Sequence, residues 1–181
     1  DWMQVLALLC VALIPFFLLL DYFTRPHELF LRFAFYRGVT TVGVLAAYVW
    51  IRAKGPTPYY PFQGYVLSGM ISLMIVVMTV DLGGFDSSYY AGLMLVIMAV
   101  NMLLSWRPIH SVVNGTMVTC LYLGVNAVGG KPFDVNVLIN NLYFLGSTVV
   151  ITSAFSWVRF RLVRSEYLLR SELLGANLDL D

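Results

Sequence analysis

The last fifth of the chain joins an apolar run to a charged segment with no helix breaker between them. The run 135–158 is long enough to cross a hydrocarbon core of roughly 30 Å as an α-helix. The segment 159–181 keeps leucines among charges, contains no proline and has its first glycine at Gly175. We therefore expect one helix to leave a membrane and continue in water, where it can carry a displacement or a rotation away from the bilayer.

Composition places the rest of the chain in the membrane as well. Of the 181 residues, 60% are hydrophobic and 12% are charged, against roughly a quarter charged in soluble domains. Five further apolar runs precede the last one, at 2–20, 29–51, 65–80, 89–104 and 109–128. The predicted fold is an all-α integral membrane protein of six transmembrane helices joined by short loops, with the sixth helix continuing as a signalling helix.

Two parts follow from this pattern. Residues 1–158 are predicted to form a six-helix transmembrane sensor domain, and residues 159–181 a cytoplasmic juxtamembrane signalling helix. The sequence begins without methionine and ends within the predicted helix. We therefore expect it to be a piece of a longer protein.

Basic residues are unevenly shared between the two sets of loops. One set carries Arg52, Lys54, Arg107, Arg159, Arg161 and Arg164. The other carries only Arg25 and Lys131 as basic residues, together with four aspartates. Because positively charged loops stay on the cytoplasmic side, the pattern predicts a multi-pass membrane protein with both termini in the cytoplasm.

The sequence has no pattern typical of a catalytic or metal centre. His27 and His110 fall on opposite sides of the predicted membrane, so they are not expected to share a metal or a haem. Phosphate-binding glycine loops and nucleophile elbows are missing. Cys10 and Cys120 lie in apolar runs and are expected to be small buried hydrophobes. We expect no catalytic residue, metal or cofactor here, and no nucleic-acid partner at a net charge of +1.

Arg37 lies deep in the second apolar run, where a charged guanidinium without a partner is energetically unfavourable in hydrocarbon. Two interpretations are open. The guanidinium can snorkel or pair with an acid such as Asp81, in which case its role is structural. Alternatively, it can meet the anionic or carbonyl-bearing head of a ligand.

Polar residues at the depth of Arg37 predict a pocket in the outer half of the bundle. The second, fourth and sixth helices are expected to converge on it. The candidate ligand-binding residues are Arg37, Tyr89, Tyr90, Asn140, Asn141 and Tyr143. Adjacent asparagines differ by about 100° around a helix, so only one of the pair 140–141 can face the cavity. Aromatic and aliphatic walls would suit a small lipophilic or amphipathic ligand.

Buried asparagines also have a simpler interpretation, which is hydrogen bonding between helices. Asn101 in the fourth run and Asn114 in the fifth are placed for it, and the same alternative holds for Asn140 and Asn141.

The charged tail carries apolar residues at sevenfold spacing. Phe160, Tyr167 and Leu174 form one row, and a second row begins at Phe155. Such rows are typical of a parallel coiled coil, so the three residues of the first row are the candidate signal-transmitting and dimer residues. The alternative is an amphipathic helix lying on the inner leaflet.

Two stretches, FDSSYYAGLMLVIMAVNMLLSW and INNLYFLGSTVVITSAFSWVRFRLVRSEYLLRSEL, carry a family resemblance. The sequence resembles the six-span membrane sensor regions that precede the catalytic parts of bacterial sensor histidine kinases. Its layout is also similar to the membrane anchors of bacterial class III adenylate cyclases and to six-span quorum-sensing receptor kinases. The likeness in residues rests on 89–92 and 140–144. It implies a homodimeric receptor of a two-component system that lies in a bacterial inner membrane and whose effector follows Asp181.

We therefore predict a signal-input module that senses a lipophilic or amphipathic ligand or a membrane state. Its partners would be membrane lipid, a small ligand, a second copy and a cytoplasmic effector, for which a histidine kinase is the first candidate. These residues would not be an enzyme themselves. The alternatives are the anchor of a class III nucleotide cyclase, a small transporter or channel, or a purely structural anchor.

Overall fold

The computed structural model describes residues 2–54, 60–104 and 106–178. Within them the chain is helical throughout, with short turns. Its elements are α1 (Trp2–Thr24), α2 (His27–Lys54), α3 (Tyr60–Asp81), η1 (Gly84–Asp86), η2 (Ser88–Tyr90), α4 (Ala91–Leu103), α5 (Pro108–Gly129) and α6 (Val135–Leu178). Five helices are long and apolar enough to cross a membrane, and 88–103 forms a shorter apolar helix. The predicted all-α membrane architecture is confirmed at this level.

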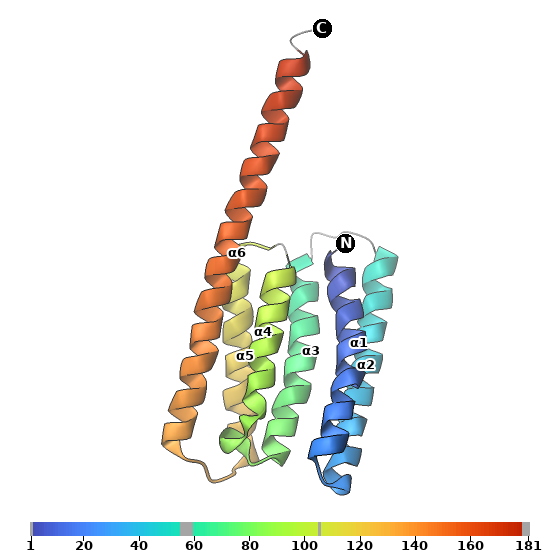
Figure 1. The fold of residues 1–181 in the computed structure, drawn as a ribbon, viewed down its shortest axis with the longest axis vertical. Coiled ribbons are helices and arrows are strands. Elements are labelled where there is room, and N and C mark those ends of the chain that lie inside the picture. Colours follow the sequence, from blue (N-terminus) through green and yellow to red (C-terminus); the bar gives the residue numbers. More distant parts are fainter. Residues whose placement is uncertain (1, 55–59, 105, 179–181) are drawn as a thin grey trace.

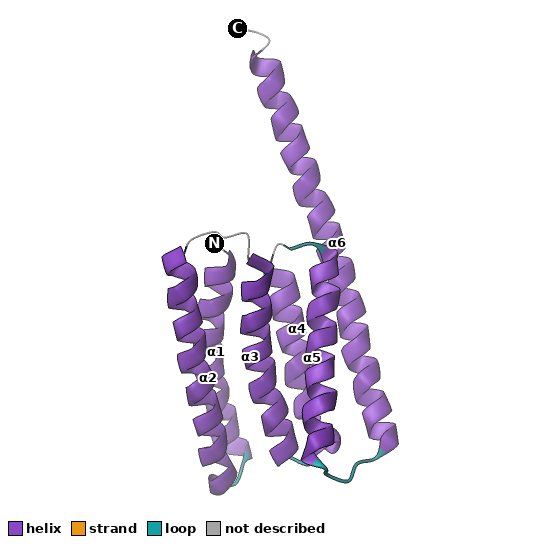
Figure 2. Ribbon diagram, turned by 180° about the vertical axis from the view of Figure 1, so that it is seen from behind, coloured by secondary structure: helices purple, strands orange, loops and turns teal. Residues whose placement is uncertain are grey.

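The helices form an up-and-down bundle (Figure 1). The hairpin of α1 and α2 lies on one side, α5 and α6 lie on the other, and α3 and α4 stand between them (Figures 1 and 2). We call the end of the bundle from which α6 emerges the exit end. The opposite end, which holds the α1–α2 turn, the two 3-10 helices and the α5–α6 loop, is the far end (Figure 1). The first helix begins at the exit end.

Local sequence signals explain where several helices begin and end. Pro26 precedes α2, and Pro108 is the first residue of α5, where its missing N–H costs no hydrogen bond. Gly130, at φ 60°, ends α5 in the left-handed conformation that favours glycine. Gly83 and Gly84, at φ 108° and 72°, make the sharp turn after α3.

The sixth helix confirms the predicted continuous rod. It runs for 44 residues, about 66 Å at 1.5 Å per residue, which is roughly twice the hydrocarbon thickness. Its first half packs against α4 and α5, and the second half projects beyond the bundle (Figure 1). Every residue from 160 to 170 is exposed.

Small residues let the helices approach closely. A Cβ atom on Gly115 of α5 would lie 2.3 Å from Cγ2 of Val149 in α6, and a Cβ atom on Gly43 of α2 would lie 2.3 Å from Cε of Met70 in α3. A side chain at Gly115 would also meet Cγ1 and Cβ of Val149, at 2.8 and 3.1 Å, so it would push α5 and α6 apart, whereas at Gly43 the flexible end of Met70 can move aside. Such contacts are how helices gain packing energy in lipid, where no hydrophobic effect drives them together.

Candidate functional site

An ion pair is buried at the far end of the bundle, between α1 and α2. Nε of Arg37 donates to Oδ2 of Asp21 at 2.7 Å. Asp21 is 0% exposed and Arg37 is 6% exposed. The hydroxyl of Tyr89, in η2, donates to the other oxygen of Asp21 and accepts from Arg37 at 3.1 Å. We call Asp21, Arg37 and Tyr89 the charged cluster.

The expectation that Arg37 pairs with an acid is confirmed, but the example given, Asp81, is the wrong acid. Asp21 stands on the last turn of α1, and the tight α1–α2 turn folds it back against the third turn of α2. Asp81 instead accepts a hydrogen bond from the hydroxyl of Tyr36 at 3.2 Å. A partner on the other helix of the hairpin, 16 residues away in sequence, is therefore preferred to an acid on α3.

The guanidinium of Arg37 is held by protein groups on several sides. Besides Asp21 and Tyr89 it donates to the backbone carbonyl of Ile14 at 3.4 Å, and it lies 5.8 Å from the ring centre of Phe17. A buried charge with a close counter-ion and further hydrogen bonds avoids most of the cost of leaving water. An anionic ligand head would have to displace one of these acceptors in order to reach Arg37.

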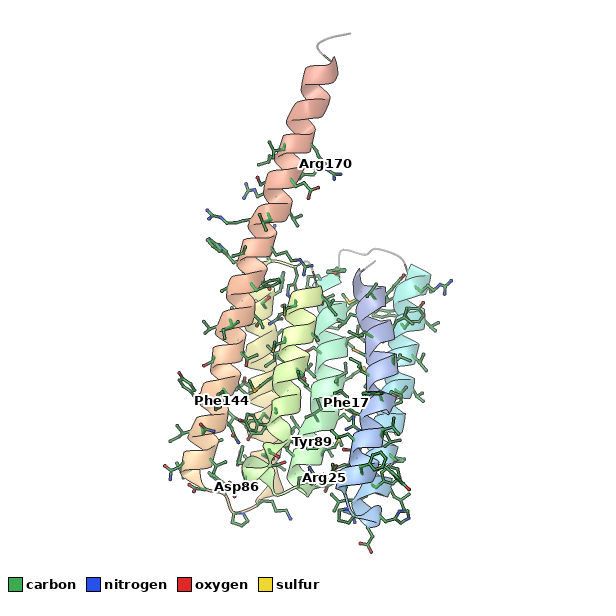
Figure 3. The ribbon with its side chains drawn as sticks, viewed as in Figure 1. Phe17, Arg25, Asp86, Tyr89, Phe144 and Arg170 are labelled. Atoms are coloured by element: carbon green, nitrogen blue, oxygen red, sulfur yellow. The ribbon has the colours of Figure 1, made fainter. Side chains whose placement is uncertain are left out.

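A second arginine flanks the charged cluster. Arg25 lies with its guanidinium carbon 5.4 Å from the ring centre of Tyr89, and Figure 3 shows the two side chains close together at the far end. Its Nε is buried and has no hydrogen-bond partner in the structure. Tyr89, at the start of the fourth apolar segment, is thus held by residues of both α1 and α2.

The two adjacent asparagines of α6 point in different directions, as predicted. Asn141 is 2% exposed, and its Nδ2 donates to the carbonyl of Phe85 at 2.8 Å and to the hydroxyl of Tyr122 at 3.1 Å. Asn140 is exposed. Hydrogen bonding between helices therefore accounts for Asn141.

The six predicted ligand-binding residues do not gather around one pocket. Arg37 and Tyr89 meet in the charged cluster, Asn141 lies in a separate group against α5, and Tyr90 is half-buried. Asn140 is exposed, and Tyr143 is 71% exposed. The expected convergence of α2, α4 and α6 is wrong because the α1–α2 hairpin and α6 lie on opposite sides of the bundle (Figures 1 and 2). The binding role of these residues stays a prediction.

One hollow in the structure, of about 460 Å³, is lined by Leu142, Tyr143, Gly146, Ser147, Val150 and Ile151. All of these belong to α6, so the hollow is a depression on the surface of one helix. It contains one of the predicted ligand-binding residues, Tyr143.

A second polar group lies nearer the exit end and joins α4, α5 and α6. We call it the exit network, and its members are Asn101, Ser111, Asn114, Thr152 and Ser156. All five are buried. Asn101 donates to Thr152 at 3.0 Å and accepts from Asn114 at 3.2 Å. Ser111 donates to Ser156 at 2.8 Å, and Ser156 donates to the carbonyl of Asn101 at 3.1 Å.

Arg159 extends these contacts to the point where α6 leaves the bundle. Its guanidinium donates to the carbonyl of Met102 and, at 3.2 Å, to that of Leu103. These carbonyls end α4, where a helix has unpaired acceptors and a partial negative charge. Arg159 was predicted only as a cytoplasmic charge. Its spacing from Thr152 and Ser156, by seven and three residues, could have placed all three on one helix face.

The predicted dimer residues of the tail are available at the surface. Phe160 is 37% exposed and Tyr167 is 73% exposed, while the side chain of Leu174 lies outside the described residues. Arg161 lies 4.4 Å from the ring centre of Trp157, a pairing typical of a membrane interface. The homodimer itself stays a prediction.

Titratable side chains elsewhere do not assemble into a metal centre: within the part of the chain that the structure describes, no three His, Cys, Asp or Glu residues could hold an ion together. His110 is engaged at Nδ1 by the hydroxyl of Tyr65 at 2.8 Å. Cys10 is half-buried, and Cys120 is exposed on the bundle surface. The expectation of a buried thiol is therefore wrong for Cys120.

Comparison with known proteins gives the chain a family. The model of MASE8, a family of membrane-associated sensory domains, matches residues 19–174. The match runs from the end of α1 to the exposed part of α6, and so it includes both the charged cluster and the exit network. Neither the curated proteins nor the solved structures gave a significant match. The chain belongs to the MASE8 family.

Proposed function

We propose that this sensory domain is the input module of a receptor and that it signals through α6 to a cytoplasmic effector following the chain. The family supports the sensory role. One observation carries the route: the helix that holds Asn141, Thr152 and Ser156 inside the bundle is the same unbroken helix that is exposed from 160 to 170. A change in the buried half therefore has a rigid path out of the membrane.

The exit end is the cytoplasmic end in this proposal. The support is the positive-inside rule, because Arg52 lies in the last turn of α2, Arg107 lies directly before α5, and Arg159 lies where α6 leaves the bundle. Both termini would then be in the cytoplasm of a bacterial inner membrane. Reporters fused after residue 181 test the orientation: a cytoplasmic reporter should be active, and an active periplasmic one would overturn the topology.

The stimulus is proposed to be a lipophilic or amphipathic ligand or a membrane state that alters the far end. Because Arg37 is already held by Asp21, an anionic or carbonyl-bearing head would act by competing for the guanidinium. Such a change becomes a signal only if the two arrangements bind the stimulus with different affinity.

Effector output against stimulus in the full-length protein tests this. Arg37→Ala and Asn141→Ala should each shift the dose response at normal membrane levels. Asn140→Ala is the matched control, because the neighbouring side chain is exposed. If neither Arg37→Ala nor Asn141→Ala changes the response, both residues are structural and the proposed site is wrong.

The effector is proposed to be a histidine kinase of a two-component system, with a class III nucleotide cyclase as the alternative. Either would supply the enzymatic activity, and the residues of this chain would not. Since such effectors act as dimers, we propose a parallel homodimer along the tail, using Phe160, Tyr167 and Leu174. Single cysteines at these positions should give disulfide-linked dimers in native membranes. If none of the three single-cysteine variants crosslinks, the proposed dimer contact along the tail is wrong.

A further inference from the structure

We propose that α4 is the element that couples the charged cluster to the exit of α6. The proposal rests on the proposed signalling through α6 and deepens it by naming the helix that moves. It rests on which helices the two buried polar groups join, and it is tested on helix position alone. Its failure would therefore leave the sensory assignment standing.

The two ends of the fourth segment are held by different partners. At the far end, the hydroxyl of Tyr89, immediately before α4, is bound by Asp21 of α1 and Arg37 of α2. At the exit end, Asn101 of α4 is bound by Thr152 of α6. One short helix, from Ala91 to Leu103, therefore has both polar groups at its ends.

The partners at the exit end are on α6 at its point of departure. Ser156 donates to the carbonyl of Asn101, and Arg159 donates to the carbonyls of Met102 and Leu103. The first exposed position beyond this contact is Phe160. A shift of α4 along or around its axis moves the acceptors of Ser156 and Arg159, and so it acts on α6 where the tail begins.

Direct contact between the charged cluster and α6 does not explain this arrangement, because the α1–α2 hairpin and α6 lie on opposite sides of the bundle (Figures 1 and 2). Another helix must therefore connect the charged cluster to the exit end. The 13 residues of α4, at 1.5 Å each, span about 20 Å along the bundle axis. The bridge formed by α4 ends in hydrogen bonds to α6.

The third helix is the other candidate, since it also runs from one end of the bundle to the other and packs against α2, α4 and α5. Its polar contact at the exit end is different: the hydroxyl of Tyr65 meets His110 of α5. Tyr65 therefore provides a matched control, a tyrosine hydroxyl at the exit end whose partner lies on neither α4 nor α6.

The substitution Tyr89→Phe tests the coupling with little risk to folding. It keeps the ring against Arg25 and removes only the hydroxyl that ties α4 to Asp21 and Arg37. Because helix shifts at such interfaces are about 1–2 Å, the expected result is a shift of that size between α5 and the start of the tail.

Paired spin labels measure that distance in the whole chain, reconstituted in lipid. Ile109→Cys on α5 and Leu162→Cys on α6 are suitable because both side chains are exposed, at 60% and 65%. The native thiols, Cys10 and Cys120, are first replaced by alanine. The label pair is validated by Arg159→Gln, which removes the hydrogen bonds of this guanidinium to the carbonyls that end α4 and should change the distance distribution.

The expected result is that Tyr89→Phe shifts the distribution and that the shift disappears when Ser156→Ala and Arg159→Gln are also present. Tyr65→Phe should leave the distribution unchanged. The proposal is overturned if Tyr89→Phe has no effect while Arg159→Gln does, or if the effect of Tyr89→Phe survives the loss of the exit contacts.

Discussion

The buried ion pair makes a quantitative prediction. The pair joins Asp21, which is 0% exposed, to Arg37, which is 6% exposed, at 2.7 Å. Asp21→Asn or Arg37→Gln alone leaves one charge buried without its counter-ion, a change that costs about 3–5 kcal/mol in folded proteins. The double variant leaves no charge and can keep an amide hydrogen bond in place of the charged one. Its expected cost is about 1 kcal/mol, the difference between charged and neutral hydrogen bonds.

The double variant is therefore expected to be more stable than either single one. Unfolding in mixed micelles by titration with SDS can measure this, because the unfolded chain lets either charge reach water. Trp106, which is 5% exposed, should report the transition through its fluorescence. Tyr89→Phe, which removes a hydroxyl bonded to both charged partners but keeps the ion pair, should cost about 1.5–3 kcal/mol, less than the loss of either charge. If the double variant is destabilised by the sum of the two single destabilisations, the two charges do not stabilise each other in the membrane.

Other substitutions test the packing and the separate roles of neighbouring residues. Gly115→Ala should destabilise the bundle by about 1–3 kcal/mol, because its Cβ would meet Val149 at 2.3 Å; Gly124→Ala, with nothing within 4 Å, should be neutral or slightly stabilising in the same SDS titration. Asn141→Ala should cost about 1–3 kcal/mol, since it leaves the hydroxyl of Tyr122 without its donor and leaves the carbonyl of Phe85 with only the longer hydrogen bond from Tyr122, at 3.4 Å. Asn140→Ala should change stability by less than about 0.5 kcal/mol, and equal effects of the two alanines would contradict the assigned orientation of α6.

The helices could be predicted because membranes leave few options for the backbone. Apolar runs between short polar turns must be helices, since unpaired N–H and C=O groups are too costly in hydrocarbon. The boundaries were less accurate: the apolar run 65–80 lies within a helix that begins at Tyr60. Hydropathy locates the part of a helix in lipid, whereas the hydrogen-bonded helix continues into the interface.

The partners of the polar residues could be predicted only in kind. A deep arginine requires an acid, but the choice between Asp21 and Asp81 depends on which helices are neighbours, and a hydropathy pattern contains no information on neighbours. The same lack of helix order led to one pocket being expected where Arg37 and Asn141 belong to two separate groups. Arg159 was missed as a partner of α4 because a basic residue just after a span is first explained by the positive-inside rule.

The division of polar residues between the two ends has a physical consequence for transmission. If α6 packed against its neighbours through apolar residues alone, it could slide or rotate at little free-energy cost, because each apolar contact that is lost is replaced by a similar one. Hydrogen bonds at Asn141 near one end and at Thr152 and Ser156 near the other restrict α6 to arrangements in which all of them are made. The position of a helix that is fixed at discrete partners can change in steps rather than continuously. That property is needed if a 44-residue helix is to deliver a defined change to an effector instead of a fluctuating one.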